Sequence, residues 1–160
     1  MTLITRRRLA CVLAVLTLAA ITSACFPDVS STPPADGWDA TLFQLINRTR
    51  TNAGLPPVAN SPKLGNVAGS WSAQMSTDNW MRHQDLGALL GTGDLAGYST
   101  LGETLFVASG GPSPVGVATA WIWSGPHRSI ILDPRFNLVG VGHVWGPDGS
   151  LWVTADFGSR

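Results

Sequence analysis

Apolar residues recur at helical spacing in three segments of this 160-residue chain, which predicts three helices. The first helix begins near Asp36 and ends before Gly54 and Pro56, which interrupt helices. The third begins at Ser113-Pro114 and runs toward Ser124. The apolar stripe of the first consists of Leu42, Leu45, Ile46 and Thr49, and that of the third of Val117, Ala118 and Trp121.

The second helix is predicted to open at Ser61-Pro62, because serine caps exposed amides and proline suits the first helical turn. Its apolar face consists of Leu64, Val67, Ala68, Trp71 and Met75. Gly65 and Gly69 each lower helix propensity by about 1 kcal/mol relative to alanine, so this helix must owe its stability to packing. Small residues at these two positions would permit the close approach of another element.

In the C-terminal part of the chain, large residues alternate with small or polar ones, as they do in β-strands. Residues 138–145 and 151–157 alternate on either side of Gly146-Pro147-Asp148-Gly149, which fits a type I turn and predicts a hairpin. Residues 103–108 are a third candidate strand, and the glycine-rich residues 87–102 are expected to form a long loop. The element order predicts an α+β fold, with a small antiparallel sheet covered by helices.

The N-terminus has the pattern of an export signal. Arg6-Arg7-Arg8 precede an apolar run over residues 9–21, and small residues follow as far as Cys25. The run is shorter than the ~20 residues that a bilayer span needs, so a permanent membrane helix is the weaker interpretation. Residues 1–24 are therefore predicted to be a signal peptide, and export is expected.

The cleavage region Thr22-Ser23-Ala24-Cys25 resembles a bacterial lipobox, which predicts a lipoprotein-type signal and lipidation of Cys25. Ordinary cleavage, which would leave a free thiol, is the alternative. Residues 25–37, rich in proline, serine and threonine, are predicted to be a flexible tether, and residues 38–160 a globular domain. The protein would then lie on the outer face of the cell membrane or be secreted.

Composition and charge narrow the choice of function. Hydrophobic residues make up 44% of the chain and seven tryptophans are present, enough to build a core. The chain has ten basic and ten acidic residues; without the three N-terminal arginines, seven basic residues face ten acidic ones, a net charge of −3. Because nucleic-acid binding demands clustered positive charge, that class is set aside.

Few residues remain that could carry chemistry. Glu103 is the only glutamate in the chain and has apolar neighbours, so its carboxylate must either find a partner or be neutralised. His83 and His127 each lie just beyond a predicted helix, where a lone histidine is most often a hydrogen-bonded structural residue. A structural role is also predicted for His143, within a strand.

The sequence HRSIILDPRFNLVGVG at residues 127–142 resembles the signature S-P-G-H-R-x-N-I-L-x-P-x-F-x-x-V-G-V-G of the bacterial SCP-like branch of the CAP superfamily. Three further segments are similar to family motifs in the same order. Residues 45–57 resemble the first helix of the family and the segment that follows it. Gly102-Glu103 matches the start of the family's G-E-N motif, and residues 152–158 resemble its closing strand. The resemblance covers roughly residues 38–158.

The resemblance implies an α-β-α sandwich with a central cleft where two histidines and two acidic residues converge. His83, Glu103 and His127 occupy three of these four places, and Ser124 stands where the eukaryotic pattern has glutamate. Two imidazoles and a carboxylate could supply three ligands to Zn²⁺ and leave one position for water. Without metal, Glu103 could accept hydrogen bonds from one or both imidazoles, which would raise the histidine pKa values.

Three functions fit these observations. The favoured one is a monomeric, non-enzymatic extracellular binding module for an apolar small molecule, a lipid or a cell-envelope partner. The second is a hydrolase, with Ser124 as nucleophile, His127 as base and Glu103 as orienting acid, or with metal-activated water. The third is a structural domain of the envelope with a vestigial cleft.

Overall fold

The computed structural model describes residues 37–160, apart from the side chain of Asp94. The predicted signal peptide (1–24), the lipidation of Cys25 and nearly all of the predicted tether (25–37) lie outside the described residues. Gly37 already belongs to the first helix, one residue before the predicted domain boundary. Within residues 37–160, no helix combines the length and the hydropathy needed to cross a membrane.

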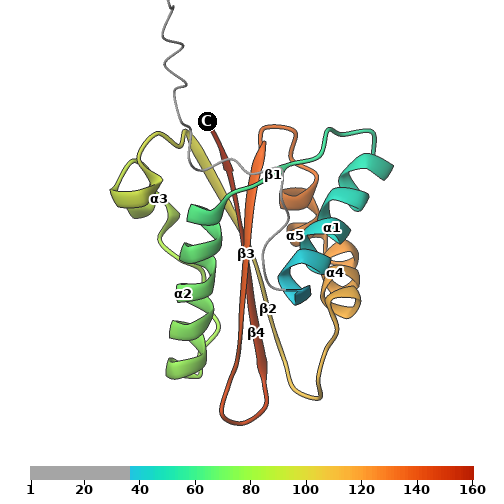
Figure 1. Ribbon diagram of the computed structural model, residues 1–160, viewed down its shortest axis with the longest axis vertical. Coiled ribbons are helices and arrows are strands. Elements are labelled where there is room, and N and C mark those ends of the chain that lie inside the picture. Colours follow the sequence, from blue (N-terminus) through green and yellow to red (C-terminus); the bar gives the residue numbers. More distant parts are fainter. Residues whose placement is uncertain (1–36) are drawn as a thin grey trace, which may run out of the picture.

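The fold has three layers, as predicted. The helices are α1 (Gly37–Asn52), α2 (Pro62–Asp78), α3 (Leu86–Leu89), α4 (Pro114–Trp123) and α5 (Gly125–Ile131), with the 3-10 helix η1 (Gly93–Leu95). The strands are β1 (Ala59–Asn60), β2 (Thr100–Ala108), β3 (Leu138–Trp145) and β4 (Leu151–Ser159). Helix α2 covers one face of the sheet, and α1, α4 and α5 cover the other (Figure 1).

The strand order is β1-β3-β4-β2, so β2 lies at an edge of the sheet. Strands β2, β4 and β3 are antiparallel, which confirms the predicted hairpin. Gly149 closes its turn by donating its N–H to the Gly146 carbonyl, 3.0 Å away, in a left-handed conformation with φ +76° that suits glycine. Strand β1 was not predicted; it pairs in parallel with β3 over two residues and makes the sheet mixed.

In the middle of the chain the predicted loop is wrong, one strand begins earlier than predicted, and one helix was missed. The expected loop 87–102 contains most of α3, all of η1 and the start of β2, which begins at Thr100 rather than Glu103. Helix α5, which follows α4 after the single residue Ser124, was not predicted either. Helix α3 is one turn capped by the Asp85 carboxylate, and α5 has only seven residues. Helices this short do not contain enough residues to show a repeating pattern of apolar positions, so the sequence did not predict them.

Glycines on β3 bring α2 into backbone contact with the sheet. A Cβ atom on Gly140 would overlap the backbone nitrogen of Gly65, and one on Gly142 would overlap that of Gly69. This confirms that the glycines of α2 lie at a close approach. The fully buried Ser72 hydroxyl donates to the Gly142 carbonyl at 3.0 Å. Helix α2 is therefore fixed at a short distance above β3.

Arg50 joins α1 to the segment that carries α5. Its fully buried guanidinium donates hydrogen bonds of 2.8–3.0 Å to four carbonyl oxygens, those of Pro56, Ile131, Asp133 and Phe136. Ile131 is the last residue of α5, so one of these bonds satisfies a carbonyl at a helix C-terminus. Arg50 thereby fixes the helix on which His127 lies.

Candidate functional site

The candidate site is built around Glu103 on the edge strand β2. Asn79 caps the C-terminus of α2, and its left-handed backbone (φ 48°) ends the helix and turns the chain away from its axis. His83 follows, and its Nδ1 lies 2.6 Å from Glu103 Oε1. Because a carboxylate only accepts hydrogen bonds, Nδ1 carries the proton of this bond. The Glu103 side chain is 1% exposed and that of His83 is 64% exposed, so the imidazole covers a buried acid.

Gln84 supplies two further hydrogen bonds to Glu103. Its backbone N–H donates to Oε1 and its side-chain Nε2 donates to Oε2, both at 3.1 Å. The same Nε2 lies 3.1 and 3.2 Å from the two carboxyl oxygens of Asp156. The single amide of Gln84 therefore bridges two acids, and three donor groups surround Glu103.

Asp156 is a site residue that the sequence analysis missed. It lies on β4 directly opposite Glu103 on β2, and it is 3% exposed. Burial, and next the charge of Glu103, raise the pKa of Asp156 well above 3.8, while the hydrogen bond from Gln84 opposes the shift. As the pH falls, Asp156 therefore takes up a proton at a higher pH than an ordinary aspartate does. We call these two residues the acid pair.

The remaining predicted histidine, His127, lies on α5. Its ring centroid is 6.4 Å from that of Trp121. Burial, and next the positive charge of His83, lower the pKa of His127 below 6.5, so the two imidazoles are close enough to influence each other. Within the described part of the chain, His127 makes no hydrogen bond to Glu103. One imidazole thus binds the glutamate, and the expected rise in pKa is wrong for His127.

Ser124 lies between α4 and α5, where it ends one helix and precedes the other. Its side chain makes no capping hydrogen bond. Among the hydrogen bonds of residues 37–160, none joins the Ser124 hydroxyl to His127. The predicted nucleophile and base are therefore close in the chain but are not a hydrogen-bonded pair.

The described residues do not fit the predicted three-ligand zinc centre. Across residues 37–160, no group of three or more His, Cys, Asp or Glu side chains is arranged to hold a metal ion. The carboxylate oxygens of Glu103 accept hydrogen bonds from His83 and Gln84 instead. A metal at Glu103 would have to displace these donors.

The third histidine, His143, has the structural surroundings predicted for it. Its Nδ1 lies 2.8 Å from Asp39 Oδ1, and its ring centroid is 4.6 Å from that of Trp38. Both partners lie in the first turn of α1. His143 thus attaches the start of α1 to β3 and takes no part in the candidate site.

Sequence comparisons agree with the family resemblance. The sequence profile of CAP, the cysteine-rich secretory protein family, matches residues 43–157. A curated protein of Bacillus subtilis strain 168, described as uncharacterized protein YkwD, is 30% identical over 132 residues. The match covers 78% of this chain and 48% of that relative, so the chain spans about half the length of the relative.

Two solved structures have a similar fold. An extracellular protein containing an SCP domain from Bacillus anthracis has a TM-score of 0.62 and 27% identity, over 74% of this chain and 39% of that chain. An outer surface protein from Borrelia burgdorferi has a TM-score of 0.63 and 19% identity, over 74% of this chain and 90% of that chain. The second likeness, at 19% identity, concerns the fold alone. Together these structures confirm the predicted α-β-α sandwich.

Proposed function

Since this chain is a bacterial member of the cysteine-rich secretory protein (CAP) family, we propose that it is an exported binding module of the cell envelope without enzymatic activity of its own. Its partner is an apolar small molecule, a lipid or another envelope component. The binding surface comprises the exposed side chains beside His83 and His127. The protein acts as a monomer.

The main support for this proposal is that the acid pair is buried and hydrogen-bonded. Glu103 and Asp156 are almost fully buried, and both are bound to Gln84. Acids in this position hold a loop against the sheet and do not reach a substrate, because a catalytic group needs direct access to the reacting atoms. The burial of the acid pair therefore favours a role in supporting a binding surface.

Exposed apolar side chains next to each histidine support an apolar partner. Trp80 is 63% exposed and Met81 49% exposed, just before His83. Trp123 is 85% exposed and comes four residues before His127. Aromatic residues and methionine are enriched where proteins bind partners.

Export and anchoring rest on the N-terminal sequence and on the relatives. One relative with a similar fold is described as extracellular and another as an outer surface protein. We propose that Cys25 is lipidated and holds the domain on the outer face of the membrane, with secretion as the alternative.

The hydrolase alternative has less support. Nucleophilic catalysis needs a hydroxyl within hydrogen-bond reach of its base, and the base in turn needs an orienting group. Among the described residues, the Ser124 hydroxyl has no bond to His127, and Glu103 orients His83 instead. Zinc binding likewise stays a prediction, since Glu103 is engaged with other donors.

Native mass spectrometry of the full chain, purified from the exported fraction of bacterial cells, tests the proposal. We expect a retained apolar adduct and a mass increase from acylation at Cys25. Trp123→Ser should reduce the adduct severalfold because it removes an exposed aromatic contact. Trp145→Ser should not, because this tryptophan, 46% exposed, lies at the end of β3.

Other results of the same measurements would contradict the proposal. A stoichiometric zinc adduct lost in His127→Ala would indicate a metal centre. Turnover of a simple ester that falls by orders of magnitude in Glu103→Gln would favour the hydrolase. A spectrum without any adduct, identical in parent and Trp123→Ser, would favour a structural domain with a vestigial cleft.

A further inference from the structure

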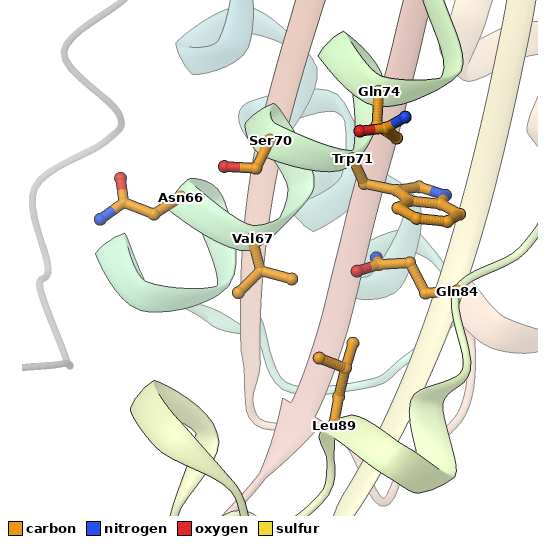
Figure 2. A pocket seen from close by; sticks show the side chains of 7 residues that line it. All are labelled: Asn66, Val67, Ser70, Trp71, Gln74, Gln84 and Leu89. Carbon is orange, nitrogen blue, oxygen red and sulfur yellow. The ribbon is translucent and has the colours of Figure 1, made fainter. Parts of the chain in front are cut away.

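A cavity of about 390 Å³ lies between α2 and the segment that contains α3, beside the candidate site. Figure 2 shows its lining side chains, five from α2 together with Gln84 and Leu89. The volume falls within the roughly 300–1,000 Å³ that is usual for small-molecule pockets. Neither the acid pair nor the two histidines line it. The cavity is therefore distinct from the surface proposed to bind an apolar partner.

Part of the lining is apolar and fixed in position. Val67 and Leu89 lie on facing elements, and the indole of Trp71, which also lines the cavity, extends above Gln84 in Figure 2. The Trp71 Nε1–H donates to the Arg82 carbonyl at 2.9 Å, and the Arg82 guanidinium lies 4.9 Å from the indole centroid. These two contacts hold the ring in one orientation.

The amide of Gln84 is oriented by the acid pair. Its Nε2 must face Glu103 and Asp156, because carboxylate oxygens accept hydrogen bonds from N–H groups. Its carbonyl oxygen then points the other way, and Figure 2 shows this oxygen on the side of Val67. Within the described residues, no donor binds that oxygen. The buried acids thus present a hydrogen-bond acceptor to the cavity.

Gln74 repeats this arrangement at the other end of the cavity. Its Nε2 lies 3.0 and 2.9 Å from the two carboxylate oxygens of Asp78, which leaves its carbonyl oxygen as a second acceptor. Asn66 and Ser70 add an amide and a hydroxyl, and neither side chain is hydrogen-bonded to another described residue. The lining contains no charged side chain among the described residues.

The combination of apolar side chains with uncharged polar groups in the lining determines which kind of molecule fits the cavity. A lipid chain would leave these polar groups without partners, which costs free energy. An anion would meet two carbonyl oxygens and no cationic side chain, and a cation would meet no carboxylate in the described lining. A molecule with many hydroxyl groups and one apolar face satisfies the acceptors and packs against Trp71, Val67 and Leu89.

We propose that this cavity binds an uncharged saccharide of one or two rings. The sugar hydroxyls donate to the carbonyl oxygens of Gln74 and Gln84 and exchange hydrogen bonds with Asn66 and Ser70. The apolar face of a ring packs against the fixed indole of Trp71. This site does not depend on the proposed apolar partner, because the two surfaces share no lining residue.

Titration of the isotopically labelled full chain with N,N′-diacetylchitobiose and with maltose, followed by amide NMR, tests the proposal. We expect saturable shifts of the Gln84 and Gln74 side-chain amides for at least one of these neutral disaccharides. Glucuronic acid and decanoic acid serve as a charged and an apolar probe, and neither should displace the bound disaccharide.

Ser70→Leu should weaken disaccharide binding at least tenfold, because it fills the cavity and removes a hydroxyl. Ala73→Leu is the matched control, since Ala73 is exposed on the same helix but does not line the cavity. Unchanged binding in Ser70→Leu, saturation by decanoic acid in place of a sugar, or no binding of either disaccharide would overturn the proposal. Loss of the apolar adduct described above would leave this result unaffected, so the two proposals fail separately.

Discussion

Asp156 shows how a single buried side chain links the fold to pH. It lies on β4, opposite a second acid on β2, and burial together with the Glu103 charge raises its pKa. Gln84 is the described residue that donates a hydrogen bond to it. An acid in such surroundings is a cost to stability whenever it is ionised.

The sign of the pH dependence follows from this shift. Between 3.8 and the raised pKa, the folded protein holds a proton on Asp156 that the unfolded chain has released. The contribution of Asp156 to stability is therefore lost as the pH rises through the folded pKa. Asp156→Asn, which stays neutral, should have a higher free energy of unfolding than the parent above that pKa, with the difference shrinking toward pH 4.

Urea denaturation of parent and variant across pH 4 to 9 measures this effect. Asp148→Asn is a suitable control, because Asp148 is exposed in the hairpin turn and its pKa is lowered by hydrogen bonds from Ser150. That substitution should not stabilise the protein at neutral pH. A constant difference between parent and Asp156→Asn at all pH values would show that Asp156 does not titrate in this range.

At the scale of elements, the packing of α2 on β3 depends on where glycine stands. Each helix glycine lies against a strand glycine, but the two sides are not equivalent. A Cβ on Gly142 would overlap the backbone of Gly69, whereas a Cβ on Gly69 would have no neighbour within 4 Å. The close approach therefore requires the strand glycine and merely tolerates the helix one.

Gly142→Ala is expected to destabilise the domain by about 3 kcal/mol, because backbone atoms of α2 cannot move aside as a flexible side chain does. Gly69→Ala should instead stabilise it by up to about 1 kcal/mol, through the higher helix propensity of alanine. Free energies of unfolding from chemical denaturation distinguish the two. Equal destabilisation by both substitutions would mean that the contact is not one-sided.

At the scale of the whole molecule, Arg50 connects segments that lie more than 80 positions apart. Its four carbonyl acceptors belong to the loop after α1 and to the segment from the end of α5 to β3. A planar guanidinium suits this arrangement, because it presents several donors in fixed directions. Loss of these bonds would release the helix of His127 from α1.

Arg50→Met should lower the free energy of unfolding by about 4 kcal/mol, since it leaves several buried carbonyl groups without donors. Arg50→Lys should recover only part of this, because an ammonium group cannot reach all four acceptors. Arg48→Met, two residues away and exposed, should change stability by less than about 0.5 kcal/mol. A similar small effect at both positions, measured by denaturation, would contradict the role of Arg50.

The amino-acid sequence by itself determined the three long helices, the C-terminal hairpin and three of the candidate site residues. These features are local: helical spacing, a cap such as Ser61, or a turn such as residues 146–149 is read within a few positions. The family resemblance implied that His83, Glu103 and His127 converge in a cleft, but it left open whether one or both histidines bind the glutamate.

Only the tertiary structure decided which groups meet. Gln84 and Asp156 are 72 positions apart, and the register of β2 against β4 is what places Asp156 opposite Glu103. The same register directs the Gln84 carbonyl into the cavity beside α2. Strand register and the position of a loop on an edge strand depend on many distant contacts at once, and no short stretch of sequence encodes them.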